Sequence, residues 1–134
     1  MLDIKTPFSN VVLESIKLNA AGIVSFAANT LKSGSFVEPT STIGEWKLAT
    51  AAAKAARPLF VQDLNPQTIA TGMATIVRGK VHCVTDQFVG TPAVGDELVV
   101  ETLTGKLIVA ADSVNAVATV IRYDSTTTPA TLHY

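Results

Sequence analysis

The residues with the greatest chemical reactivity in this 134-residue chain are two histidines and a single cysteine. His82 and Cys83 are adjacent, and neighbouring side chains of a strand point to opposite faces, so the two cannot bind one metal ion together. The second histidine, His133, lies next to the last residue. One cysteine excludes a disulfide framework within the chain and is compatible with a reducing compartment, so we expect Cys83 to be a small buried apolar side chain. The sequence predicts no metal site and no cofactor.

Patterns for other kinds of catalysis are also missing from the sequence. No serine lies in a nucleophile elbow, and no glycine-rich phosphate loop precedes a helix. Several acidic residues could form paired carboxylates, but most of them lie in or beside expected turns, where aspartate normally caps or bends the backbone. They are Asp63, Asp86, Asp96, Glu97, Glu101 and Asp112. We therefore predict no catalytic residue and a protein that is not an enzyme.

One hairpin, GDELVVETLTGK at residues 95–106, is similar to the hairpin of biotinyl and lipoyl carrier domains, in which a lysine at the tip is modified. Those domains place this lysine third after a glutamate. Here Glu101 is followed by two threonines and a leucine, and the lysine arrives only at Lys106, beyond the corner glycine Gly105. The modification site is missing.

The elements that must position these residues are expected to be short strands. The clearest is a hairpin at 94–110, with a turn at Gly95-Asp96 and a tight corner at Thr104-Gly105. A second is the alternating segment 75–84, which places basic side chains on one face and apolar ones on the other, with a bulge or sharp bend at Gly79.

Further strands are predicted at 10–18, 22–28, 35–39, 43–48, 58–64, 116–123 and 131–134, and turns at 19–22 and 65–68. Helical propensity is high only at Ala49–Ala56, which Arg57-Pro58 must end, so this segment is one or two helical turns or a loop. About nine or ten strands with frequent turns predict an all-β fold. We expect a compact small barrel or sandwich of short antiparallel strands with at most one short helix, forming a single domain over residues 9–134.

Residues 1–8 show no period, because Pro7 interrupts a segment whose apolar residues are Leu2, Ile4 and Phe8. Two interpretations are open: a tail that packs over the edge of the barrel, or an N-terminal arm that reaches a neighbouring molecule.

The composition is apolar for a small domain: 48% of the residues are hydrophobic and only 16% are charged. No apolar run approaches the roughly 20 residues of a transmembrane helix, and residues 1–10 do not resemble a signal peptide. We therefore expect part of the surface to be buried in a homo-oligomer or a larger assembly, with Trp46 as a core or interface anchor. A net charge of −1 makes nucleic acid an unlikely partner.

Four segments share a pattern with one protein family: GSFVEPT at 34–40, LATAAAKAARPLFVQ at 48–62, PAVGDELVVETLTGKLIVA at 92–110 and NAVATVIRY at 115–123. Over residues 20–123 the chain resembles the head decoration, or capsid cement, proteins of tailed bacteriophages. The resemblance implies a non-enzymatic protein made in the host cytoplasm and located on the capsid exterior. Its partner would be the major capsid protein, whose neighbouring subunits it would clamp, often as a homotrimer. Leu2, Ile4 and Phe8 are our candidates for capsid contact.

Two other functions remain open. One is a different structural component of a virion or tail with a similar β-rich composition. The other is a small barrel of the OB type that binds oligonucleotides, since Arg78, Lys80 and His82 form a basic stripe. No aromatic residue alternates with that stripe, whereas stacking on bases requires aromatic side chains.

Overall fold

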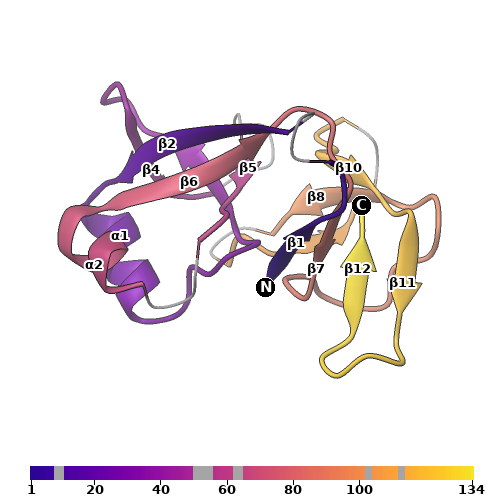
Figure 1. The fold of residues 1–134 in the computed structure, drawn as a ribbon. Helices are drawn as coiled ribbons and strands as arrows, with labels where there is room; N and C mark the ends of the chain where they lie inside the picture. The colour runs from indigo at the N-terminus through magenta and orange to yellow at the C-terminus, as the bar shows by residue number, and fades with distance from the viewer. Residues whose placement is uncertain (8–10, 50–55, 62–64, 102–103, 112–113) are drawn as a thin grey trace.

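The computed structural model describes residues 1–7, 11–49, 56–61, 65–101, 104–111 and 114–134. Within these ranges the chain forms twelve short strands and two short helices (Figure 1). The strands are β1 (Leu2–Ile4), β2 (Val12–Leu18), β3 (Phe36–Pro39), β4 (Glu45–Leu48), β5 (Arg57–Pro58), β6 (Met73–Arg78), β7 (Cys83–Thr85), β8 (Glu97–Val100), β9 (Leu107–Val109), β10 (Ala118–Thr119), β11 (Arg122–Asp124) and β12 (Thr131–His133). The helices are α1 (Ala20–Ala27) and α2 (Pro66–Thr71).

These strands make three sheets, in which every pair of strands is antiparallel except β2 with β4. The orders are β5-β3-β4-β2-β6, β1-β7-β12-β11 and β10-β8-β9. In the five-stranded sheet, Leu59, which follows the edge strand β5, forms an isolated bridge with Ile76 of the other edge strand, β6. The described part of the chain does not form a closed barrel. The all-β class predicted from the sequence is confirmed.

Two hydrophobic cores lie on opposite faces of the five-stranded sheet. Side chains alternate along a strand, so Phe36 of β3 enters the first core while Val37 enters the second. Ile76 and Val77 of β6 divide between the cores in the same way. The first core also holds the buried side chains of β1, β7, β8, β9 and β12, and the second holds those of β2, β4 and α1. The apolar residues on both faces of β3 and β6 are therefore explained by the two cores of this one chain.

The predicted hairpin at 94–110 is confirmed as β8 and β9, in which Leu98 pairs with Val109 and Val100 with Leu107. Gly105 turns the chain with a φ of +68°. The Gly105 carbonyl accepts a hydrogen bond of 2.8 Å from the amide of Phe36, so the corner is docked on β3. A Cβ at this position would lie 2.9 Å from the Phe36 carbonyl oxygen, which leaves room only for glycine.

The predictions of a strand at 22–28 and of a simple turn at 65–68 are wrong, because both segments are helical. Asn19 caps α1, since its side-chain oxygen accepts a hydrogen bond of 2.8 Å from the amide of Gly22. Asn65 caps α2 in the same manner, Pro66 opens it, and Gly72 ends it in the left-handed region. The described residues thus form two short helices, one more than expected, and neither lies at Ala49–Ala56, of which residues 50–55 are outside the described residues.

Two strands predicted as continuous are each divided. Residues 75–78 of the predicted segment belong to β6, and residues 83–84 belong to β7. Between the two strands the chain turns at Gly79, whose φ is +86°. The expected bend is therefore a full break in the strand. The segment 116–123 likewise divides into β10 and β11, which belong to two different sheets.

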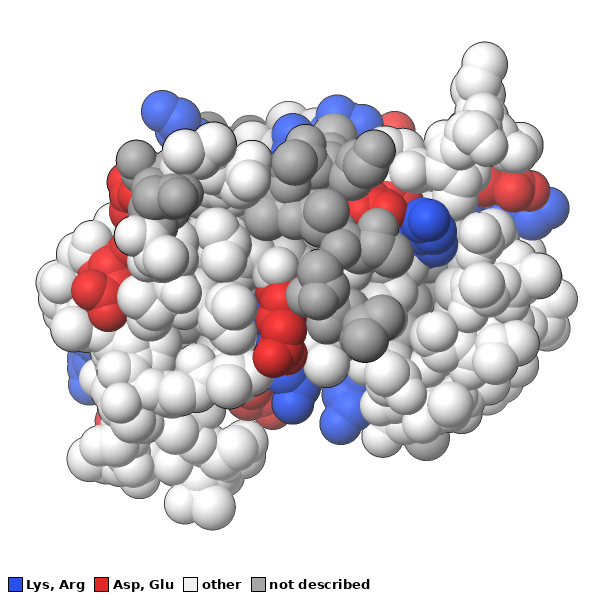
Figure 2. Space-filling view, turned by 180° about the vertical axis from the view of Figure 1, so that it is seen from behind, with Lys and Arg blue, Asp and Glu red and all other residues white. Residues whose placement is uncertain are grey.

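The surface carries few charges, as the composition leads one to expect. On the face opposite to that of Figure 1, acidic and basic side chains stand singly or in small groups on a largely neutral surface (Figure 2). No helix of the described residues is long and apolar enough to cross a membrane.

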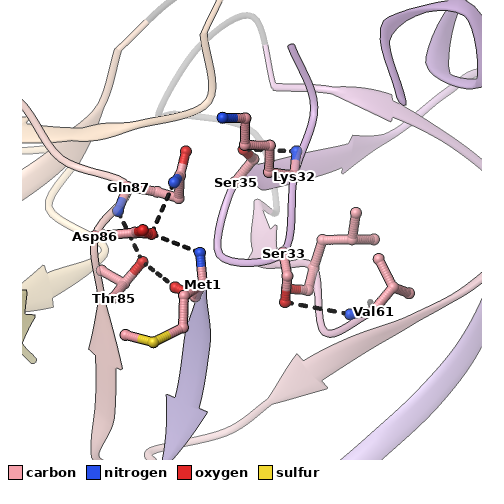
Figure 3. Close-up of polar contacts among 9 residues, drawn as sticks. Met1, Lys32, Ser33, Ser35, Val61, Thr85, Asp86 and Gln87 are labelled. Atoms are coloured by element: carbon pink, nitrogen blue, oxygen red, sulfur yellow. Dashed lines mark hydrogen bonds and ion pairs between the residues drawn. The ribbon is translucent and has the colours of Figure 1, made fainter. Parts of the chain in front are cut away.

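At a polar junction, residues 32–35, which precede β3, lie beside residues 85–87 at the end of β7 (Figure 3). Gly34 adopts a φ of +95°, and its amide donates to the Leu59 carbonyl at 2.7 Å. The Thr85 hydroxyl donates to the Met1 carbonyl at 2.9 Å and accepts from the Gln87 amide at 3.0 Å. The bonds of Thr85, which is fully buried, connect the end of β7 to Met1, and the bond of Gly34 connects residues 32–35 to Leu59. The two segments themselves meet by close packing, since a Cβ at Gly34 would lie 2.6 Å from the Thr85 hydroxyl oxygen.

Candidate functional site

A cleft of about 760 Å³ lies among the described residues. Its walls come from β5, from the connection between β6 and β7, from β10 and from Tyr134. These segments belong to three different sheets, so the cleft lies where the sheets meet. Most of its lining is apolar, including Phe36, Val77 and Ile121.

The polar part of the cleft is basic. Arg57 and Lys80 line it, and none of the described lining residues is acidic. The guanidinium of Arg57 donates through one terminal nitrogen to the Ala56 carbonyl at 2.8 Å, while its Nε is buried without a hydrogen-bond partner. Lys80 is exposed and forms no ion pair with any described residue.

Cys83 and Tyr134 lie side by side at the inner end of this lining. Both are buried, and both belong to the first core. Burial raises the pKa of the Cys83 thiol to about 11, and it raises the pKa of the Tyr134 hydroxyl well above that of an ordinary tyrosine. Both groups are therefore neutral at pH 7. The thiol is a buried small side chain, as we expected, and its protonated state makes it a poor nucleophile.

His82 and His133 meet, although 50 residues separate them in sequence. Nε2 of His82 lies 3.1 Å from Nδ1 of His133, within hydrogen-bond distance, and the ring centroids are 5.4 Å apart. The His82 amide donates to the Thr6 hydroxyl at 2.8 Å, which fixes the first histidine. Partial burial, the His82 ring and the Arg122 guanidinium lower the pKa of His133. Sequence reasoning named each histidine separately, because no local pattern shows that they form a pair.

This pair does not extend to a larger donor set. Among the described residues, no group of three or more His, Cys, Asp or Glu side chains could hold a metal ion. The two ring nitrogens hydrogen-bond to each other, which occupies one of the two nitrogens of each ring.

The acidic residues that we considered as carboxylate pairs have separate local roles. Asp96 accepts from the Ala93 amide at 2.8 Å and so holds the turn before β8. Glu101 accepts from the Thr104 hydroxyl at the corner after β8. Burial alone would raise the pKa of Asp86, but hydrogen bonds from the amino terminus and from Gln87 outweigh it and lower the pKa. Glu97 is exposed in β8, and Asp63 and Asp112 lie outside the described residues.

The residues proposed for capsid contact have different positions. Leu2 and Ile4 belong to β1 at the edge of its sheet, and their side chains are only 6% and 9% exposed. Residues 2–4 therefore form the edge strand of a sheet, and little of either side chain is exposed. Phe8 lies outside the described residues. Trp46 is 6% exposed and belongs to the second core.

The basic stripe at 78–82 is divided among three arrangements. Arg78 forms an ion pair with Glu14 of β2, Lys80 lines the cleft, and His82 binds His133. Because the strand breaks at Gly79, these side chains do not form one flat basic face.

Apolar side chains are exposed at many places on the surface. The most exposed is Ile43, whose relative accessibility of 101% equals that of a free side chain. It lies in the connection between β3 and β4, residues 40–44, which projects from the body of the molecule at the upper left of Figure 1. Val114, Val94 and Val24 are the next most exposed, at 81%, 72% and 68%.

Comparison with known proteins adds no relative: no family model matches the chain, and no match was found among curated proteins or solved structures. Its function must therefore be inferred from its own residues and geometry.

Proposed function

We propose that this protein is a non-enzymatic structural protein of a bacteriophage virion that binds the outer surface of the capsid and clamps neighbouring capsid subunits. The resemblance of residues 20–123 to head decoration proteins supports this proposal. The partner is the major capsid protein, and the protein acts as a homo-oligomer, with a trimer favoured. A compact fold of short strands with two cores suits this role, since a clamp must resist deformation.

The observation that carries the proposal is the projecting connection 40–44 with its fully exposed isoleucine. A large apolar side chain with no cover of its own is unfavourable in water, and exposed apolar surface marks sites of protein contact. Its neighbours Thr40 and Glu45 hold the connection in shape, since the Thr40 amide donates to the Glu45 carbonyl at 2.8 Å. Ile43 is therefore presented on a braced turn and fits the insertion of one side chain into a pocket of a partner.

The energy of such a contact is modest for one copy and large for an oligomer. Burying an isoleucine side chain stabilises a complex by about 1.5–3 kcal/mol. A trimer would make three such contacts at once, and linked contacts raise the overall affinity far above that of each one. A weak single insertion is therefore compatible with near-permanent attachment to a capsid.

Co-sedimentation tests the proposal directly. Purified protein is titrated against expanded, undecorated heads of the phage that encodes it, and bound copies are counted per capsid subunit. Saturation at a fixed ratio supports a decoration protein, and the ratio identifies its symmetry site. No binding to heads contradicts the proposal, and assembly into a ring or a head-to-tail stack would instead favour a tail component.

The contact itself is tested with Ile43→Ser. We expect affinity for heads to fall at least about tenfold, the equivalent of the lower estimate for one buried isoleucine. The matched control is Val24→Ser, which makes the same kind of exchange on the exposed side of α1. If both variants bind like the unaltered protein, or if both lose affinity equally, the connection 40–44 is not the contact.

A further inference from the structure

The cleft has the size and the apolar walls of a small-molecule site. Its volume of about 760 Å³ lies within the range of roughly 300–1,000 Å³ that such sites occupy. Phe36, Val77 and Val81 line one part of it, and Val117 and Ile121 another. A bound molecule with a hydrocarbon or aromatic body would displace water from the cleft and pack against these side chains.

The charged side chains of the cleft favour a negatively charged ligand. Arg57 and Lys80 both line it, and no described lining residue is acidic. The ammonium of Lys80 is free of ion pairs with the described residues. The apolar walls reduce screening by solvent, so these two cations would attract an anion more strongly than they would on an open surface.

Two buried polar atoms of the lining residues have no hydrogen-bond partner among the described residues: Nε of Arg57 and the hydroxyl of Tyr134. The Tyr134 side chain interacts with the Cys83 thiol, which is a weak hydrogen-bonding group. Buried polar groups are normally satisfied, and leaving one unsatisfied is unfavourable. Because both atoms are buried, they lie behind the surface of the cleft, and an occupant would contact the exposed Lys80 and the outer part of the half-buried Arg57 instead.

From the apolar walls and the two cations, we propose that this cleft binds an amphiphilic organic anion, a carboxylate or sulfonate with an apolar body. Arg57 and Lys80 bind the anionic group, and the apolar walls cover the body. This site is separate from the connection 40–44 and does not depend on capsid binding.

The probe is octanoate, whose binding to the full chain is measured by calorimetry, with 1-octanol as the neutral analogue of equal length. We expect saturable binding of octanoate with one molecule per chain and at least tenfold weaker binding of 1-octanol. Lys80→Gln should weaken octanoate binding about five- to tenfold, which lies within the range of an ordinary hydrogen bond. Lys17→Gln is the matched control, because this exposed lysine of β2 does not line the cleft.

The proposal is overturned if octanoate does not bind saturably, if 1-octanol binds equally well, or if Lys17→Gln weakens binding as much as Lys80→Gln does.

Discussion

Replacing Gly34 by alanine probes how tightly the polar junction is built. A Cβ at Gly34 would lie 2.6 Å from the Thr85 hydroxyl oxygen, 3.0 Å from the Met1 carbonyl oxygen and 3.2 Å from a Gln87 side-chain carbon. The matched control is Gly44→Ala, since Gly44 has a similar φ of +84° but no atom within 4 Å of the added Cβ. The difference between the two variants isolates the close contact from the backbone strain.

The expected magnitudes follow from these distances. A left-handed conformation costs a non-glycine residue about 1 kcal/mol, which both variants share. In Gly34→Ala the added methyl must also displace the Thr85 hydroxyl, which is buried and makes two hydrogen bonds, each worth about 1 kcal/mol. We therefore expect the free energy of unfolding to fall by about 3 kcal/mol for Gly34→Ala and about 1 kcal/mol for Gly44→Ala.

Urea unfolding, followed by far-UV circular dichroism, measures both values, and equal slopes would show that the two-state comparison is valid. Thr85→Ala removes the nearest atom, so adding Gly34→Ala to it should be less damaging, by about 2 kcal/mol, than in the unaltered protein. If Gly34→Ala and Gly44→Ala destabilise the protein equally, the junction is not closely packed and the reasoning fails.

Three further predictions concern the histidine pair and the first core. The pKa of His133 is lower in the folded protein than in the unfolded chain, so the unfolded chain takes up the proton first as the pH falls. The stability contributed by neutral His133 is therefore complete above pH 6.5 and is lost as the pH falls toward the pKa of the folded protein. The urea midpoint should drop over this pH interval, and it should drop less in His133→Asn. Leu98→Ala should lower the unfolding free energy by about 2–5 kcal/mol in the same assay, since this side chain is fully buried. Cys83 should resist a thiol reagent at pH 8 until urea unfolds the protein, and rapid labelling of the native chain would contradict its burial.

The strands of this fold were predictable where the alternation was short and bounded by turns. β3, β4, β8, β9 and β12 all lie within segments predicted from such patterns. Helix α1 was missed because Ile23 and Val24 are β-branched and favour a strand. The capping residue Asn19 and the burial of Phe26 stabilise the helix instead. The Asn-Pro start and the glycine end of α2 were visible in the sequence, and they specify a helix more than a turn.

The cleft and the histidine pair were not predictable in the same way. Their residues come from segments far apart in the sequence: Arg57 from β5, Lys80 from the turn after β6, and His133 from β12. Local patterns fix which face a side chain takes, but only the pairing of strands brings such faces together. His82 and His133 meet because β12 pairs with β7, with His133 opposite Val84.

The arrangement of two cores on one sheet also determines how the protein can come apart. β3 and β6 each supply side chains to both cores, so neither core can lose its packing without exposing a strand that the other one needs. We therefore expect the two cores to unfold together. Amide protons in β3 and β6 should then exchange only through global unfolding, and a protease would find no stable half of the chain to release.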